Sequence, residues 1–145
     1  MTEPQFRSAT ELAAMIRRRE LSSRELLELF LARIEKQNPR LNAVVTLDAE
    51  GARATAKLAD AALDRGESWG PLHGLPITIK DSFETAGVRT TAGSPTLANH
   101  VPAQDADAVK RLRGAGAVIL GKTNLPVFAG DVQSYNPVFG TTSNP

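Results

Sequence analysis

Apolar residues recur at helical spacing in the first half of the chain. A Ser-x-x-Glu capping pattern at Ser8–Glu11 precedes the first set and predicts a helix that begins near Thr10. The same pattern at Ser22–Glu25 precedes a longer apolar stripe and predicts a second helix that ends near Asn38-Pro39. An alanine-rich segment over 48–64 predicts a third helix. The chain therefore opens with helices.

Short apolar runs, two of them rich in β-branched residues, predict strands at 43–47, 75–80 and 117–120. Alternate residues of a strand share a face, so the second run places its isoleucines on one side and Thr78 and Lys80 on the other. One face of this strand is then apolar, and the other carries a lysine at its end.

The residues between the last two predicted strands form a crossover connection. Residues 85–104 are rich in Gly, Pro, Ser and Thr and are interpreted as a long ordered loop. Asp105 and Asp107 favour a helix start, and Gly114 ends that helix. Strand, helix and strand in this order form a βαβ unit, which predicts an α/β fold with a parallel or mixed β-sheet flanked by helices.

The two parts of the chain differ in composition. Residues 1–73 hold 11 basic and 11 acidic side chains, which leaves 6 (17 − 11) and 5 (16 − 11) for residues 74–145. Glycine is distributed in the opposite sense, with 3 of 11 in the first part. We therefore expect a helical opening and loop over 1–73 and a strand-helix-strand part over 74–145.

Composition narrows the functional classes. A formal charge of +1 argues against a general electrostatic nucleic-acid binder. The chain has no cysteine, so it has no disulfide and no thiolate site, and its two histidines, His73 and His100, lie far apart. No apolar run approaches the roughly 18–20 residues of a membrane span, and the start lacks the features of a secretory signal. These observations predict a cytoplasmic protein without a metal.

Residues 116–123 match the phosphate-loop pattern Gly-x-x-x-x-Gly-Lys-Thr. In that motif a strand comes first, the residues between the glycines form a loop, and a helix begins at Lys-Thr. Here the intervening residues are themselves the apolar strand, and Asn124-Leu125-Pro126 is a poor helix start. The context argues against nucleotide binding.

Two other features are candidates for chemistry. Lys80 at the end of its strand is either a charge that faces water or a base held in a dry site, and the pattern alone leaves both readings open. Asp81 should point to the opposite face from Lys80. The polar tail over 123–145 is either a frayed terminus or a loop that lines a substrate site, and it holds no acid–base pair of its own.

Four blocks, in order and spacing, resemble the amidase signature family: 74–81, 90–94, 105–109 and 114–124. The resemblance implies an α/β amidase-signature fold and hydrolysis of a small-molecule amide by a Ser, cis-Ser, Lys triad that needs no metal or organic cofactor. It implies that Lys80 is the triad lysine and general base. It also implies a structural turn at the strand end over 121–124 and no catalytic role for either histidine.

The family's Gly-Gly-Ser-Ser-Gly-Gly segment, which carries the serines, does not occur in these residues. We therefore expect residues 1–145 to be the N-terminal part of one amidase domain, inactive without a missing C-terminal part, with that part or a homodimer partner as its protein partner. The alternatives are a non-catalytic fragment that only binds a partner and an amidotransferase-type subunit. Residues 125–128 lack an acidic residue that many members carry, and residues 129–136 resemble stand-alone bacterial amidases more than the amidotransferase subunit.

Overall fold

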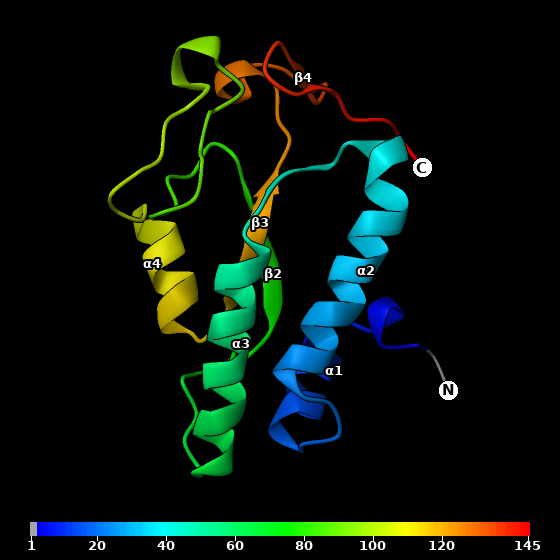
Figure 1. Cartoon of the computed structure of the whole chain (residues 1–145), viewed down its shortest axis with the longest axis vertical. Helices are drawn as coiled ribbons and strands as arrows, with labels where there is room; N and C mark the ends of the chain where they lie inside the picture. Colours follow the sequence, from blue (N-terminus) through cyan, green and yellow to red (C-terminus); the bar gives the residue numbers. More distant parts are fainter. Residues whose placement is uncertain (1–2) are drawn as a thin grey trace.

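A computed structural model describes residues 3–145 (Figure 1). Four α-helices and three strands form its main part, and short 3₁₀ helices and a small hairpin complete it. In chain order the elements are η1 (Pro4–Phe6), α1 (Ala9–Arg17), α2 (Ser23–Leu41), β1 (Val44–Leu47), α3 (Ala49–Asp64), β2 (Pro76–Lys80), η2 (Pro95–Leu97), α4 (Asp107–Gly114), β3 (Val118–Thr123), η3 (Val127–Ala129), β4 (Tyr135–Asn136) and β5 (Gly140–Thr141).

The helix starts follow the capping patterns. Ser8 and Ser22 each accept a hydrogen bond from the backbone of the glutamate three residues later, whose carboxylate returns the contact. The predicted end of α2 near Pro39 is wrong, because the helix continues to Leu41 with the proline in its last turn. Pro39 has no backbone N–H to donate within the helix, and the helix ends only at Asn42, which adopts the left-handed conformation.

The main sheet is mixed and has the order β1-β3-β2. Strand β3 lies in the centre, antiparallel to β1 and parallel to β2, with α4 in the crossover between β2 and β3. This arrangement confirms the predicted βαβ unit. The expected strand-end turn over 121–124 is corrected, because residues 121–123 belong to β3 and only Asn124 follows the strand.

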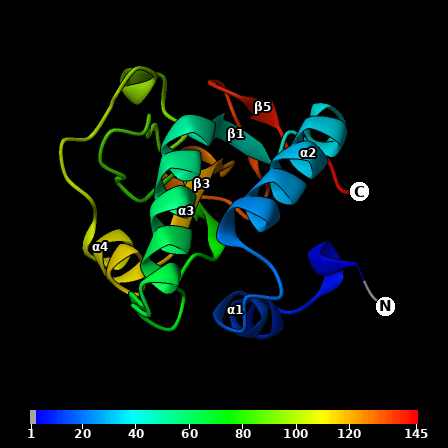
Figure 2. The same cartoon turned by 60° about the horizontal axis from the view of Figure 1, so that its bottom comes forward.

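Apolar side chains of β3 alternate between the two faces of the sheet. Val118 and Leu120 pack against α2 and α3, and Ile119 packs with Ile79 and Val109 of α4. Figure 2 shows α3 between α2 and α4. The core is therefore two apolar clusters that share the central strand, and a third cluster joins α1 to the start of β2.

A register shift interrupts this alternation. Ile77 pairs with Ile119, but Thr78 pairs with Gly121, so Leu120 is an extra residue in β3. Residues paired in register point to the same face of a sheet, and Lys122 pairs with the buried Ile79. Lys122 is therefore carried to the α4 side, whereas unbroken alternation would place it beside Leu120 on the other face.

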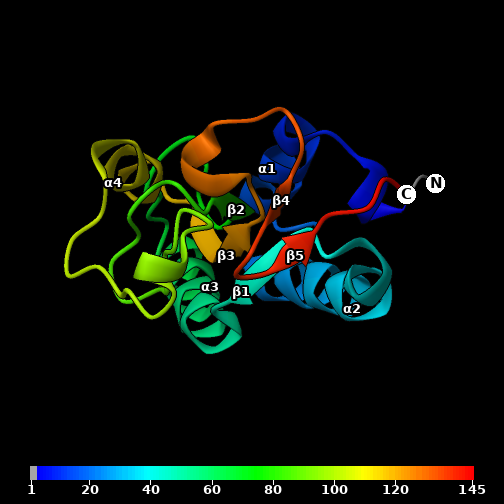
Figure 3. The same cartoon turned by 90° about the horizontal axis from the view of Figure 1, so that it is seen from above.

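Two irregular segments surround the carboxyl ends of β2 and β3. Seen from above, loop 85–104 lies on one side of these strand ends and the chain after β3 lies on the other (Figure 3). The loop is ordered as predicted, and Thr85, Thr90, Thr91 and Ser94 within it are buried. In the described part of the chain, no helix is both long and apolar enough to cross a membrane.

Gly121 allows β1 to lie close to β3, and this contact yields a first prediction. A Cβ atom at Gly121 would lie 2.3 Å from the Thr46 carbonyl oxygen, which is backbone and cannot rotate away. Gly121→Ala should therefore lower the free energy of unfolding by about 1–3 kcal/mol, measured by urea denaturation. Gly114→Ala is the matched control, since nothing lies within 4 Å of its added Cβ and its unfolding free energy should not fall. Equal stability of the two variants would contradict the prediction.

Candidate active site

Lys80 is the last residue of β2, at the carboxyl end of the sheet. Its side chain is exposed, and its amine has no hydrogen-bond or ion-pair partner among residues 3–145. Ligands of open α/β sheets bind beyond the carboxyl ends of strands. The structure thus places the predicted site residue where a substrate or a further protein segment can reach it.

Asp81 points away from Lys80 into the protein, as the alternation predicts. Its side chain is fully buried, and Oδ2 accepts hydrogen bonds from the backbone N–H and the hydroxyl of Thr91 at 3.0 and 2.6 Å. Its own N–H donates to the Thr123 carbonyl at 3.0 Å, and its carbonyl accepts from the Ala92 N–H at 3.0 Å. The residue after Lys80 is thereby fixed to both β3 and the loop.

Lys122 is a fully buried lysine beneath this strand end. Its Nζ donates to the Phe83 carbonyl at 2.6 Å and to the Thr90 hydroxyl at 2.7 Å, and it lies 3.7 Å from Oδ1 of Asp81. Asp81 Oδ1 has no hydrogen-bond donor within the described chain, so its contact with the Lys122 ammonium is an ion pair. The lysine amine is thus enclosed by oxygen atoms.

Burial lowers the pKa of Lys122 to about 8, because removal of the amine from water disfavours the charged ammonium form. The carboxylate of Asp81 acts in the opposite direction and is the main opposing influence, with smaller contributions from Asp105 and Glu84. Lys122 has the pKa expected of a base, but its amine is enclosed by protein atoms and cannot meet a substrate. Lys80, by contrast, is exposed, and its amine has no partner among the described residues.

The polar tail is folded and not frayed. The Asn124 side-chain amide donates to the Gly140 carbonyl at 3.1 Å and to the Thr142 hydroxyl at 3.0 Å. Asn136 donates to the Asn124 side-chain oxygen at 2.7 Å. These bonds join the β4–β5 hairpin to the end of β3, and Asn42 at the end of α2 donates to the Phe139 carbonyl at 2.7 Å. The tail therefore borders the carboxyl end of the sheet.

The two histidines have structural surroundings. Buried His73 accepts a hydrogen bond from the Trp69 N–H at Nδ1, 3.0 Å away, so Nε2 carries the proton that bonds to the Ala59 carbonyl at 3.0 Å. His100 contacts Glu84 at 3.2 Å. Among residues 3–145, no group of His, Asp and Glu side chains could hold a metal ion.

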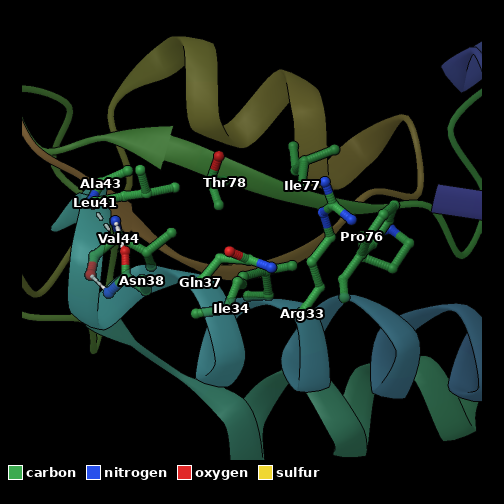
Figure 4. A pocket seen from close by; sticks show the side chains of 12 residues that line it. Arg33, Ile34, Gln37, Asn38, Leu41, Ala43, Val44, Pro76, Ile77 and Thr78 are labelled. Atoms are coloured by element: carbon green, nitrogen blue, oxygen red, sulfur yellow. Dashed lines mark hydrogen bonds between the residues drawn. The ribbon is translucent and has the colours of Figure 1, made fainter. Parts of the chain in front are cut away.

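A pocket of about 510 Å³ lies between α2 and β2. Figure 4 shows Arg33, Ile34 and Gln37 of α2 reaching toward the strand that bears Ile77 and Thr78. Among its described lining residues only Arg33 is ionisable, and Lys80 is outside the lining. The pocket therefore offers an apolar surface beside β2 and contains no acid–base pair.

The sequence predicts Lys80 as a site residue but gives no role to Lys122, which the structure shows to be buried. The family resemblance implied a turn at residues 121–124, so Lys122 was expected in a turn and not inside a strand. The available signal was the position of Lys122, only two residues after the apolar run that ends at Leu120. Its oxygen partners at positions 81, 83 and 90 are too far away in sequence to be paired by pattern.

Comparisons with known proteins agree with this architecture. The sequence pattern of the Amidase family matches residues 25–145. A glutamyl-tRNA(Gln) amidotransferase subunit of Acidothermus cellulolyticus is 46% identical over 96% of this chain, and the match covers 28% of that protein. Its name is that of the amidotransferase alternative raised by the sequence. The chain spans under a third of the curated relatives it matches.

Solved structures show the same partial coverage. The peptide amidase PAM, in complex with the competitive inhibitor chymostatin, is 38% identical with a TM-score of 0.88, and the match covers 96% of this chain and 30% of that protein. Fatty acid amide hydrolase is 29% identical with a TM-score of 0.90, and the match covers 100% of this chain and 26% of that protein. The fold described above is thus a substructure of larger enzymes.

The lowered pKa of Lys122 predicts how stability depends on pH. In the unfolded chain this lysine keeps its ordinary pKa of 10.5, so between pH 8 and 10.5 the unfolded state holds a proton that the folded state has lost. The contribution of Lys122 to the unfolding free energy should therefore rise with pH across this window, by up to about 3 kcal/mol.

Urea denaturation of the wild-type chain and of Lys122→Met at pH 7.5 and pH 10 measures this effect. The difference in unfolding free energy, wild type minus variant, should be larger at pH 10, because titration of all other groups cancels in the difference. A difference that stays constant or shrinks toward pH 10 would show that the buried amine is not desolvated as described.

Proposed function

Because this chain belongs to the amidase family, we propose that it forms the first part of an enzyme that hydrolyses a carboxylic amide, and that Lys80 is the general base of that enzyme. The observation that carries this proposal is the placement of Lys80. It is the last residue of the edge strand β2, and the backbone of the next residue, Asp81, is hydrogen-bonded to β3 and to the loop. Its amine is exposed and has no partner within the part of the chain that the structure describes.

The proposed mechanism uses Lys80 as a neutral amine. The amine accepts a proton from a bridging serine, which in turn accepts the proton of the nucleophilic serine as that serine attacks the amide carbonyl. The proton then returns by the same route to the leaving amine. Residues 1–145 do not supply these serines, so we infer that they come from a further part of the enzyme and that the chain alone does not turn over amides.

Sequencing the coding DNA beyond Pro145 tests whether such a part exists. We expect an in-frame or separately encoded segment with the Gly-Gly-Ser-Ser-Gly-Gly pattern. If no reading frame near the gene encodes this pattern, the amidase proposal fails and the alternative of a non-catalytic binding fragment is favoured.

In the amidase that carries this chain, Lys80→Ala should lower kcat for amide hydrolysis by about 10²–10⁴-fold, because a positioned base contributes a factor of that size. Ammonia or amine release measures the rate. Lys57→Ala is the matched control, since Lys57 is also exposed but lies on α3, away from the strand ends. Turnover by Lys80→Ala equal to that of the control would refute the assignment of Lys80 as base.

The names of the curated relatives favour a second candidate, in which the enzyme is one component of a multi-subunit glutamyl-tRNA(Gln) amidotransferase. The resemblance of residues 129–136 to stand-alone bacterial amidases favours the first candidate, an amidase that acts without other subunits. Assays of the purified enzyme separate the two. Hydrolysis of simple amides by the enzyme alone supports a stand-alone amidase, whereas activity that requires the other amidotransferase components supports the second.

A further inference from the structure

Lys122 is a buried ionisable side chain that the proposed mechanism does not use. We propose that Lys122 is a positioning residue for Lys80, in that its amine fastens the turn and the loop after Lys80 to the central strand β3. This inference rests on the proposed role of Lys80 as base. It assigns no catalytic contact to Lys122 itself, whose amine is enclosed by protein atoms.

The first contact holds the turn that begins at Lys80. The Phe83 N–H donates to the Lys80 carbonyl at 3.0 Å, which closes a tight turn directly after the strand. The carbonyl of Phe83 then accepts from Lys122 Nζ at 2.6 Å. Phe83 thus links the two lysines through its backbone, and the turn cannot move from β3 without breaking a charge-assisted hydrogen bond.

The other contacts hold the loop that returns past Lys80. The Thr90 hydroxyl accepts from Lys122 Nζ at 2.7 Å and donates to the Val88 carbonyl at 3.0 Å. Lys122 also forms an ion pair with Asp81, the residue directly after Lys80, and Asp81 accepts a hydrogen bond from the Thr91 hydroxyl. Lys122 therefore contacts the chain on both sides of residues 84–89, at Asp81 and Phe83 before this segment and at Thr90 after it.

The central position of β3 gives Lys122 a rigid base. Its backbone is paired with Thr46 of β1 on one side and with Ile79 of β2 on the other. An ammonium group carries three donors, and the three oxygen partners at Phe83, Thr90 and Asp81 surround it without exposure to water. A buried charge left without these partners is strongly disfavoured, so the loop is held in the one arrangement that supplies them.

Paired variants of Thr90 in the 145-residue chain provide the test. Thr90→Val keeps the side-chain shape but removes the hydroxyl that Lys122 binds, whereas Thr90→Ser keeps the hydroxyl. Native-state amide hydrogen exchange is measured at Asp81, Phe83 and Thr91, the amides that hold the segment around Lys80. Thr90→Val should speed their exchange by about 10-fold or more, and Thr90→Ser by less than about twofold.

The core amides of α3 are the internal reference for these variants. Unchanged exchange at the three amides in Thr90→Val, or an equal increase throughout α3, would overturn the inference, since the first shows that no local constraint exists and the second shows only global destabilisation. Lys122→Met should produce a larger local effect. If that variant fails to fold, the Thr90 pair still decides the question.

Kinetics in the amidase that carries this chain distinguish positioning from general structural support. Thr90→Val should lower kcat by about 10-fold with KM changed less than about twofold, because only the placement of the base is affected. Thr90→Ser should keep kcat near the wild-type value, because it retains the hydroxyl. If Lys80→Ala retains turnover, the proposed function fails. If Lys80→Ala abolishes turnover but Thr90→Val retains wild-type kcat, the inference about Lys122 alone fails.

Discussion

The amine of Lys122, buried in the central strand, sets a requirement that the surrounding chain has to meet. A charged group removed from water needs hydrogen-bond acceptors and a counter-charge, and removal of one partner from such a buried pair costs about 3–5 kcal/mol. In this chain the acceptors come from Phe83 and Thr90 and the charge from Asp81. The irregular segment after β2 is therefore ordered by polar contacts, whereas the helices are ordered by apolar packing.

Two lysines near one strand end have opposite surroundings. Lys122 is enclosed, with two hydrogen bonds and one ion pair, and these partners lie in the turn and loop that begin immediately after Lys80. Lys80 is exposed and without a partner among residues 3–145. An exposed amine on a fixed backbone is suited to meet groups supplied by another part of an enzyme. The short coverage of the relatives, 28% for the protein from Acidothermus cellulolyticus, agrees with this division.

Features near each other in sequence were predicted well. The capping boxes at Ser8 and Ser22 depend on residues three positions apart, so their helix starts could be located to within a residue or so. The faces of β2 followed from strict alternation, with Ile79 buried and Lys80 exposed. The end of α2 was misjudged because a proline disfavours the helical conformation of the residue before it, whereas here Asn38 and Pro39 stay helical and Asn42 ends the helix.

The sequence by itself determined the helix starts, the βαβ order and the lysine at the end of β2, because each depends on local periodicity and backbone chemistry. Only the tertiary structure decided the face on which Lys122 lies. The extra residue in β3 shifts its alternation relative to β2 by one position. That shift depends on contacts between strands far apart in the chain. As a result Lys122, expected in a strand-end turn, is buried and binds the turn and loop after β2.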